Sequence, residues 1–291
     1  MDEAARPVKR DVRRAFDRAA RTYDGAALLQ REICGRLLEH IDPMRLDPRR
    51  VVDLGCGTGS AFEALAKRYP RAALLGLDLA PAMLAKARER SPWWRRALGG
   101  FSPALLCADA ESLPFAGQSM QLVFSNLALQ WCDPTAVFAE VSRVLEPGGL
   151  FVFSTFGPDT LRELRAAFAE ADGAPHVNAF VDMHDLGDAL VGAGLSDPVM
   201  DMEVVTMEYG SAEAIARDLK AIGAVNSLAA RSRGLPGRSR WERMTRAYER
   251  FRRDGQLPAT FEVVYGHAWK VAPKKLADGR QVVNFAPRSL R

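Results

Sequence analysis

The stretch "VVDLGCGTGS", Val51 to Ser60, sets Gly55, Gly57 and Gly59 directly behind an apolar run that ends in an acid. A short β-branched, apolar run of this kind is typical of a buried strand. Glycine frees the backbone for turns and leaves it open to close approach by a ligand. In doubly wound folds, ligands bind where the strands end. The stretch therefore predicts an α/β chain whose first strand ends at a ligand site.

Strand-like and helical segments alternate through the first half of the chain, which predicts a mostly parallel sheet with helices on both faces. Two helices, at 10–21 and 26–40, come first, separated by a break at Asp24-Gly25. The strand-like segments that follow are 49–55, 72–80, 103–110, 120–126 and 150–156, and the helical ones between them are 60–70, 81–90 and 134–145.

The later half mixes helices with two long strands. We expect helices at 159–172 and 183–195, a strand at 199–209, an Arg-rich helical block at 211–254 and a strand at 259–271. The chain is therefore expected to form one domain over residues 1–291. Its expected parts are a helical cap at 1–44, a cofactor-binding core at 45–210, a basic helical insertion at 211–254, a last strand region at 255–272 and a tail at 273–291.

Positive charge gathers late in the chain. Residues 1–216 carry 23 Lys and Arg against 30 Asp and Glu, residues 217–254 carry 11 against 4, and the rest carry 6 against 2. A basic segment predicts either an acidic partner or a solvated helical face. No apolar run is long enough to span a bilayer, and the first residues lack the apolar core of a secretory signal, so we expect a cytoplasmic protein without membrane contact.

Metal binding is not expected. The four cysteines, Cys34, Cys56, Cys107 and Cys132, show no metal-ligand spacing, and only four histidines occur in the chain. We expect free, mostly buried thiols.

The glycine turn differs from a dinucleotide fingerprint. Its spacing is G-x-G-x-G rather than G-x-G-x-x-G, and Asp53 stands where it would repel a pyrophosphate and favour a cation. Asp78, 25 residues further on, ends the next strand and can accept hydrogen bonds from both hydroxyls of a ribose. Asp109 can accept from an adenine amino group and Met83 can pack on an adenine face, although a plain turn and a helix core are the alternatives for these two.

These segments together resemble the class I S-adenosylmethionine-dependent methyltransferases, over residues 50–156. The segments are "VVDLGCGTGS", "LGLDLAPAML", "CADAESLPF", "FSNLALQW" and "RVLEPGGLFVFST". The resemblance implies a Rossmann-like α/β fold with a mostly parallel seven-stranded sheet, an N-terminal helical cap and a helical insertion between late strands. It implies S-adenosyl-L-methionine as cofactor and S-adenosyl-L-homocysteine as product. The implied cofactor-binding residues are Asp53, Gly55, Cys56, Gly57, Gly59, Asp78, Leu79, Met83, Asp109, Ala110 and Asn126.

A narrower resemblance covers nearly the whole chain, from Phe16 to Trp269. "AFDRAARTYDGAALLQRE", "SNLALQWCDP", "STFGPDTLRELRAAF", "HVNAF", "LKAIGAVNS" and "LPATFEVVYGHAW" look like the malonyl-acyl-carrier-protein O-methyltransferases of biotin synthesis. The resemblance implies methylation of the free carboxyl of a malonyl thioester on acyl carrier protein. The methyl ester then primes pimeloyl chain synthesis.

This chemistry needs alignment more than a general base, because a carboxylate is already ionised at neutral pH. We expect Tyr23 to close the cofactor pocket, and Asn126, Gln130 and Trp131 to face the transferred methyl group. A packing role is the alternative for Tyr23 and Trp131. The candidates for binding the malonyl carboxylate are Arg162, Arg165, His176 and Asn178, for which an ordinary surface helix is the alternative.

The basic block 211–254 is expected to bind the acidic carrier protein through arginines that steer association. These are Arg231, Arg233, Arg238, Arg240, Arg243 and Arg246. Three other functions stay open at this point: a nucleic-acid methyltransferase, an assembly or hydroxylating factor of the respiratory complex I type, and a small-molecule methyltransferase. The first is disfavoured because Trp241, Tyr248 and Phe251 have the spacing of helix core.

Overall fold

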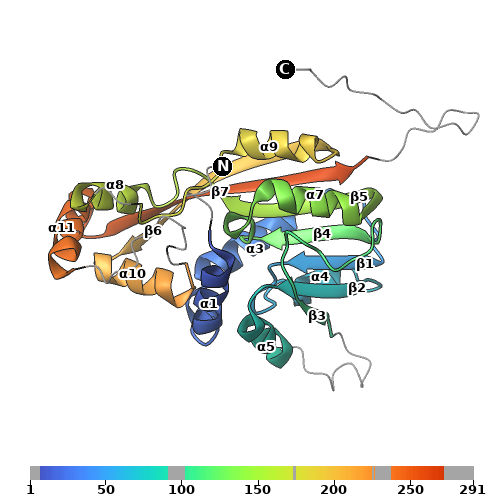
Figure 1. Ribbon diagram of the computed structural model, residues 1–291, viewed down its shortest axis with the longest axis horizontal. Helices are drawn as coiled ribbons and strands as arrows, with labels where there is room; N and C mark the ends of the chain where they lie inside the picture. The colour runs from blue at the N-terminus through green and yellow to red at the C-terminus, as the bar shows by residue number, and fades with distance from the viewer. Residues whose placement is uncertain (1–6, 91–101, 173–174, 225, 227–236, 272–291) are drawn as a thin grey trace, which may run out of the picture.

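A single seven-stranded sheet organises the computed structural model, which describes residues 7–90, 102–172, 175–224, 226 and 237–271. The strand order is β3-β2-β1-β4-β5-β7-β6, and only β7 runs antiparallel to its neighbours (Figure 1). The strands are β1 (Arg50–Leu54), β2 (Ala73–Asp78), β3 (Ala104–Cys107), β4 (Met120–Asn126), β5 (Leu145–Phe156), β6 (Leu195–Tyr209) and β7 (Leu257–Lys270). The predicted Rossmann-like, mostly parallel sheet is confirmed.

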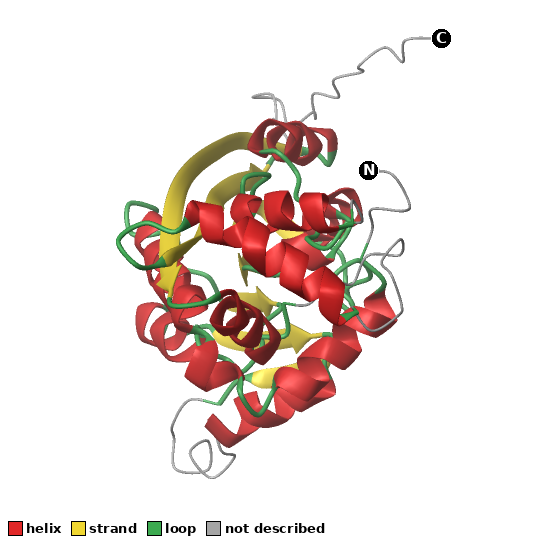
Figure 2. Cartoon of the chain, turned by 90° about the vertical axis from the view of Figure 1, so that its left-hand side faces the viewer, coloured by secondary structure: helices red, strands yellow, loops and turns green. Residues whose placement is uncertain are grey.

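Helices lie around the sheet, as Figure 2 shows. Three of them, α10, α11 and η3, lie between β6 and β7 and form the helical insertion expected between late strands. The helices are α1 (Lys9–Ala19), α2 (Tyr23–Ala26), α3 (Leu28–His40), α4 (Phe62–Arg68), α5 (Pro81–Arg90), η2 (Leu129–Trp131), α7 (Pro134–Val144), α8 (Arg162–Ala171), α9 (Met183–Gly192), α10 (Ala212–Ala221), α11 (Arg238–Tyr248) and η3 (Glu249–Phe251).

Both faces of the central strands are buried, and consecutive strand residues point to opposite faces. Val51 and Leu122 belong to the apolar cluster that includes residues of α3 and α4. Their neighbours Val52 and Val123 belong to a second cluster, with residues of α7 and α9. This two-sided burial explains why the central strands are almost continuous apolar runs.

Some segments differ from the sequence expectation. The break expected at Asp24-Gly25 separates α1 from α3 but itself forms the short helix α2. Strand β5 begins at Leu145, ahead of the expected 150–156, because backbone pairing with β4 resumes across a register shift. The expected tail at 273–291 lies outside the described residues.

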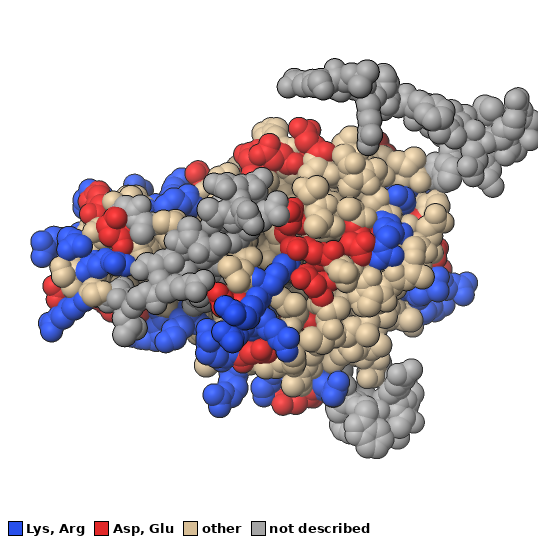
Figure 3. Space-filling model, viewed as in Figure 1, with Lys and Arg blue, Asp and Glu red and all other residues tan. Residues whose placement is uncertain are grey.

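The surface carries both exposed charges and a few exposed apolar side chains, such as Val199 and Val204 of β6. Lys and Arg side chains gather over α1 on the face drawn in Figure 3. Among the described helices, none has the length and hydropathy required to cross a membrane.

Candidate active site

The glycine turn lies at the carboxyl end of β1, at the centre of the sheet. Gly55, Gly57 and Gly59 have φ values of 69°, 53° and 78°, in the left-handed region that favours glycine. The amides of Gly55 and Cys56 both donate to the carbonyl of Leu77, at 2.7 and 3.0 Å, which ties the turn to β2. A Cβ on Gly55 would come within 2.3 Å of Cβ of Ala128, so the turn also requires a small residue there.

Asp78 ends β2 and faces the turn. Its Oδ2 accepts from the Gly57 amide at 2.9 Å and its Oδ1 from the Ala80 amide at 2.8 Å. Burial raises the pKa of Asp78 to about 6, even though these hydrogen bonds act to lower it. The carboxylate is thus held in place at the edge of a cavity.

That cavity, the cofactor cavity, encloses about 650 Å³ between atoms, including space open to solvent. The helix α1 covers it through Lys9, Val12 and Phe16. Eight of the eleven predicted cofactor residues line it: Gly55, Gly57, Asp78, Leu79, Met83, Asp109, Ala110 and Asn126.

The other three predicted cofactor residues, Asp53, Cys56 and Gly59, do not line the cofactor cavity. Asp53 is 2% exposed, and burial together with the charge of Asp78 raises its pKa to about 8. A Cβ on Gly59 would lie 2.5 Å from the ring of Phe62, so close packing requires the glycine. These three residues pack behind the turn. Their contribution to cofactor binding stays a prediction.

A second cavity, the acceptor cavity, adjoins the first and encloses about 710 Å³ on the same measure. Four residues line both cavities: Phe16, Tyr23, Leu127 and Trp131. The predicted residues Gln130, His176 and Asn178 line the acceptor cavity, among apolar side chains that include Phe156, Phe180 and Phe261. The two cavities therefore meet at Tyr23 and Trp131, which were predicted to close the cofactor pocket and to face the transferred methyl group, respectively.

The residues at this junction are fixed by their neighbours. The ring of Trp131 meets Phe16 of α1 edge-on, with centroids 5.3 Å apart. Gln130 donates to the Leu127 carbonyl at 2.6 Å and accepts from Thr155 at 3.3 Å. Burial and the carboxyls of Asp78 and Asp24 raise the pKa of Tyr23 above its ordinary value, so its phenol stays protonated at neutral pH.

His176 is oriented toward the acceptor cavity by two contacts. Its Nε2 lies 2.9 Å from Oδ1 of Asp172, and its ring stacks on Phe168 with centroids 3.9 Å apart. Asp172 also pairs with Arg240 at 3.0 Å. Asn178 is 6% exposed, and its Oδ1 has no hydrogen-bond partner among the described residues. A buried acceptor oxygen without a partner favours an N–H or O–H donor nearby.

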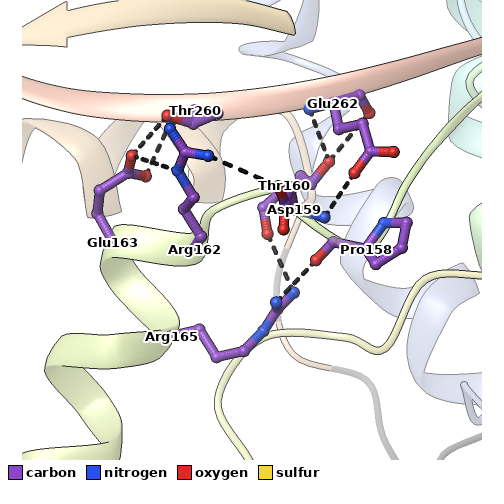
Figure 4. Close-up of polar contacts among 8 residues, drawn as sticks. All are labelled: Pro158, Asp159, Thr160, Arg162, Glu163, Arg165, Thr260 and Glu262. Carbon is purple, nitrogen blue, oxygen red and sulfur yellow. Dashed lines mark hydrogen bonds and ion pairs between the residues drawn. The ribbon is translucent and has the colours of Figure 1, made fainter. Parts of the chain in front are cut away.

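Arg162 and Arg165, the two arginines among the predicted candidates for binding the acceptor carboxylate, do not line either cavity. Arg165 donates to the carbonyls of Pro158 and Thr160, at 2.7 and 3.1 Å (Figure 4). Arg162 pairs with Glu163 at 3.3 Å and Asp159 at 3.5 Å. Both guanidiniums therefore bind groups of the preceding loop or of α8 itself.

The loop that Arg165 holds is tied to β7 as well. Buried Glu163 accepts from the amide and hydroxyl of Thr260, at 3.1 and 2.5 Å. Glu262 accepts from the Asp159 amide at 2.7 Å (Figure 4). These contacts hold Thr160 and Leu161, which line the acceptor cavity, at its wall.

Lys9 and Phe16 are site residues that the sequence analysis missed. The Lys9 ammonium lies 2.8 Å from carboxylate oxygens of both Asp109 and Glu111. Burial acts to lower the pKa of Lys9, but Cys132 and these two carboxylates outweigh it and raise the pKa. The apolar spacing that predicted a helix at 10–21 marked Phe16 as buried, but it gave no sign of what the helix covers.

Comparison with known proteins agrees with this geometry. Residues 52–153 match a family model described as a methyltransferase domain. A malonyl-[acyl-carrier protein] O-methyltransferase from Laribacter hongkongensis is 54% identical, with 99% of each chain covered. The chain belongs to the malonyl-[acyl-carrier protein] O-methyltransferase family. A member from Gallionella capsiferriformans is 51% identical, covering 94% of this chain and 95% of that protein.

The methyltransferase fold extends to distant structures. The YcgJ protein from Bacillus subtilis has a TM-score of 0.58 at 15% identity, covering 83% of this chain and 99% of that one. At this identity the likeness concerns the fold alone. In this methyltransferase, the described residues contain no group of three His, Cys, Asp or Glu side chains that could hold a metal ion.

Proposed function

We propose that this enzyme transfers a methyl group from S-adenosylmethionine to the free carboxyl of a malonyl thioester on acyl carrier protein. The methyl ester formed would prime pimeloyl chain synthesis for biotin. One observation carries the proposal: in a member of this family, a cofactor cavity and an acceptor cavity meet at Tyr23 and Trp131.

The cofactor cavity fits S-adenosylmethionine by the chemistry of its lining. Asp78 offers a buried carboxylate to ribose hydroxyls. Asp109 lines the same cavity, and Met83 supplies an apolar surface for adenine. The glycine turn leaves backbone exposed beside them. When bound, S-adenosylmethionine supplies a methyl group activated by a positively charged sulfur.

The acceptor needs positioning rather than deprotonation. A carboxyl group is ionised at neutral pH, so the site requires no general base. We assign His176 and Asn178 to orienting the malonyl group through the N–H groups of their side chains, because a carboxylate only accepts hydrogen bonds, with His176 held by Asp172. Tyr23, protonated as its raised pKa requires, can donate a hydrogen bond at the junction. The apolar wall and α1 exclude water from the junction. Exclusion of water favours the reaction because the positive sulfonium and the negative carboxylate both lose their charge as the methyl group is transferred.

The carrier protein and the compartment are part of the same proposal. An acidic carrier is attracted to basic residues within 211–254, of which α10 lies beside the acceptor cavity. Arg231 and Arg233, predicted to contribute, lie outside the described residues. All four cysteines are free, which fits the reducing cytoplasm.

Intact-protein mass spectrometry of malonyl-acyl carrier protein incubated with enzyme and S-adenosylmethionine tests this function. We expect one methyl gain on the malonyl form and none on acetyl-acyl carrier protein, which lacks the carboxyl. Asp78→Ala should abolish the gain, while Asp47→Ala, an exposed carboxylate paired with Arg71, should retain it. No gain with confirmed cofactor binding would contradict the proposal and favour the assembly-factor or small-molecule alternatives.

A further inference from the structure

Helix α1 presents a row of basic side chains to solvent. Arg10, Arg14 and Arg18 are exposed and follow one another every four residues, so they share one face of the helix. Arg21, in the turn after α1, is exposed as well. Figure 3 shows Lys and Arg side chains gathered over this helix. The opposite face packs inward.

Helix α10 extends this basic surface. The hydroxyl of Thr22, just after α1, donates to the carbonyl of Ala221 at the end of α10, at 2.9 Å. Lys220 and Arg217, one turn apart on α10, are exposed. The α1–α10 basic surface therefore consists of Arg10, Arg14, Arg18, Arg21, Arg217 and Lys220.

These cations differ in their partners from several cations of residues 238–252. Within the described part of the chain, no carboxylate lies within ion-pair distance of Arg14, Arg18 or Arg21. The same is true of Arg243 and Arg246 in α11, but four other arginines of residues 238–252 have intramolecular carboxylate partners. These are Arg238 with Glu242, Arg240 with Asp172, Arg250 with Glu170 and Arg252 with Glu249. Charges without an internal partner are the ones available to an acidic protein.

The α1–α10 basic surface also stands directly over the site. Phe16 of α1 lines both cavities, and Leu219 and Ile222, at the end of α10, line the acceptor cavity. Neither cavity is lined by a residue of α11 as the structure describes it. An acyl group carried by a protein bound over α1 and α10 would therefore start beside the acceptor cavity.

We propose that the α1–α10 basic surface is the docking site for the acidic acyl carrier protein, because α1 and α10 line the cavities whereas the described α11 lines neither. The identity of the partner rests on the proposed function; the location of the surface rests on the charges and their position over the site. Exposed charges of this kind act mainly by steering association, which makes binding sensitive to salt.

The test is a fluorescence-anisotropy titration of labelled holo-acyl carrier protein at low ionic strength. The variant Arg14→Glu/Arg18→Glu should raise the dissociation constant about tenfold or more. The control Arg238→Glu/Arg246→Glu makes the same change in charge on exposed residues of α11 and should stay within about twofold of wild type. Binding of S-adenosylhomocysteine should be equal in all three proteins.

Because Glu near the end of α1 opposes the helix dipole, Arg14→Gln/Arg18→Gln serves as a second variant, with an expected weakening of about threefold. Equal affinity of the α1 variants and wild type, or no binding by wild type, would overturn the inference. An RNA hairpin that binds more tightly than the carrier protein, and is lost with the same variant, would also overturn it. Carrier binding without methylation would contradict the proposed function alone.

Discussion

Gly55 and Gly57 share a left-handed backbone but face different surroundings. A Cβ on Gly57 would meet open space at the wall of the cofactor cavity, whereas a Cβ on Gly55 would collide with Ala128. We expect Gly57→Ala to cost about 1 kcal/mol of stability from backbone strain. Gly55→Ala should cost at least about 2 kcal/mol, because packing must also shift.

Urea unfolding and calorimetric titration with S-adenosylhomocysteine separate these two effects. Gly57→Ala should lose cofactor affinity while remaining folded, because the added methyl group occupies the cavity. Equal stability of the two variants would contradict the close packing of Gly55 on Ala128. Unchanged cofactor affinity in Gly57→Ala would mean that the turn does not contact the cofactor.

Asp53 should make the stability of the ligand-free enzyme depend on pH. Its pKa is raised to about 8 by burial, whereas the unfolded carboxyl titrates near 3.9. Between these values the folded protein keeps a proton that the unfolded chain has released. Stability therefore falls as pH rises from about 5 to 8, by up to about 1.4 kcal/mol per pH unit.

Asp53→Asn removes this titration. The free energy of unfolding of the variant, relative to that of wild type, should therefore increase as pH rises from about 5 to 8. Chemical denaturation at several pH values measures the difference. Asp47→Asn, which alters an exposed carboxylate, is the control and should show a flat difference. A flat difference for Asp53→Asn as well would show that its carboxyl titrates normally.

Some site residues could be predicted from the sequence and others could not. Asp78, Tyr23 and Trp131 stand at strand ends or next to a helix break, and these positions fix where they lie in a parallel sheet. The roles of Arg162 and Arg165 were not predictable, because the carbonyls and carboxylates that engage them come from the loop at 157–161 and from their own helix, whose folded geometry is not visible in the residue pattern.

At the scale of elements, Lys9 is one of the residues that hold α1 over the cofactor cavity, together with Asp17, which accepts from the Ala82 amide at 3.0 Å. Lys9 joins this helix to Asp109 and Glu111. Lys9→Met keeps the length of the side chain but leaves both carboxylates without this partner, at a cost of about 1–3 kcal/mol. We therefore expect the dissociation rate of S-adenosylhomocysteine to rise about tenfold, which stopped-flow fluorescence can measure.

The matched control is Arg13→Met, on the same helix. Arg13 is half exposed and its ion pair with Asp17 is long, at 3.8 Å, so the dissociation rate should change less than twofold. Identical rates for the Lys9 and Arg13 variants would show that Lys9 does not hold α1 over the cofactor.

The helix itself was predictable but its position was not. Apolar residues at helical spacing indicated α1. Its contact with α5 and with the cavity walls depends on residues far away in the sequence, such as Met83 and Trp131. Local periodicity carries no information on such contacts. That α1 covers the cofactor cavity and presents a basic face beside it is therefore visible only in the folded structure.

At the scale of the whole molecule, the sheet order places the carboxyl ends of the neighbouring strands β2, β1 and β4 side by side, so that side chains from distant segments converge there. Alternation of strands and helices predicted this convergence. The insertion before β7 was also predicted. The sequence did not predict that α10 would lie beside the acceptor cavity while arginines of α11 form ion pairs within the protein. Such contacts depend on the folded structure, because they join residues of different segments.

The central claim is that donor and acceptor occupy two cavities that meet at Tyr23 and Trp131. A crystal structure of the enzyme with S-adenosylhomocysteine and a malonyl-pantetheine amide tests it most directly. We predict the adenosine beside Asp78 and the malonyl carboxyl beside His176 and Asn178, with the homocysteine sulfur and the carboxyl on opposite sides of the junction. A malonyl group bound away from the acceptor cavity, or an adenosine away from Asp78, would contradict the account.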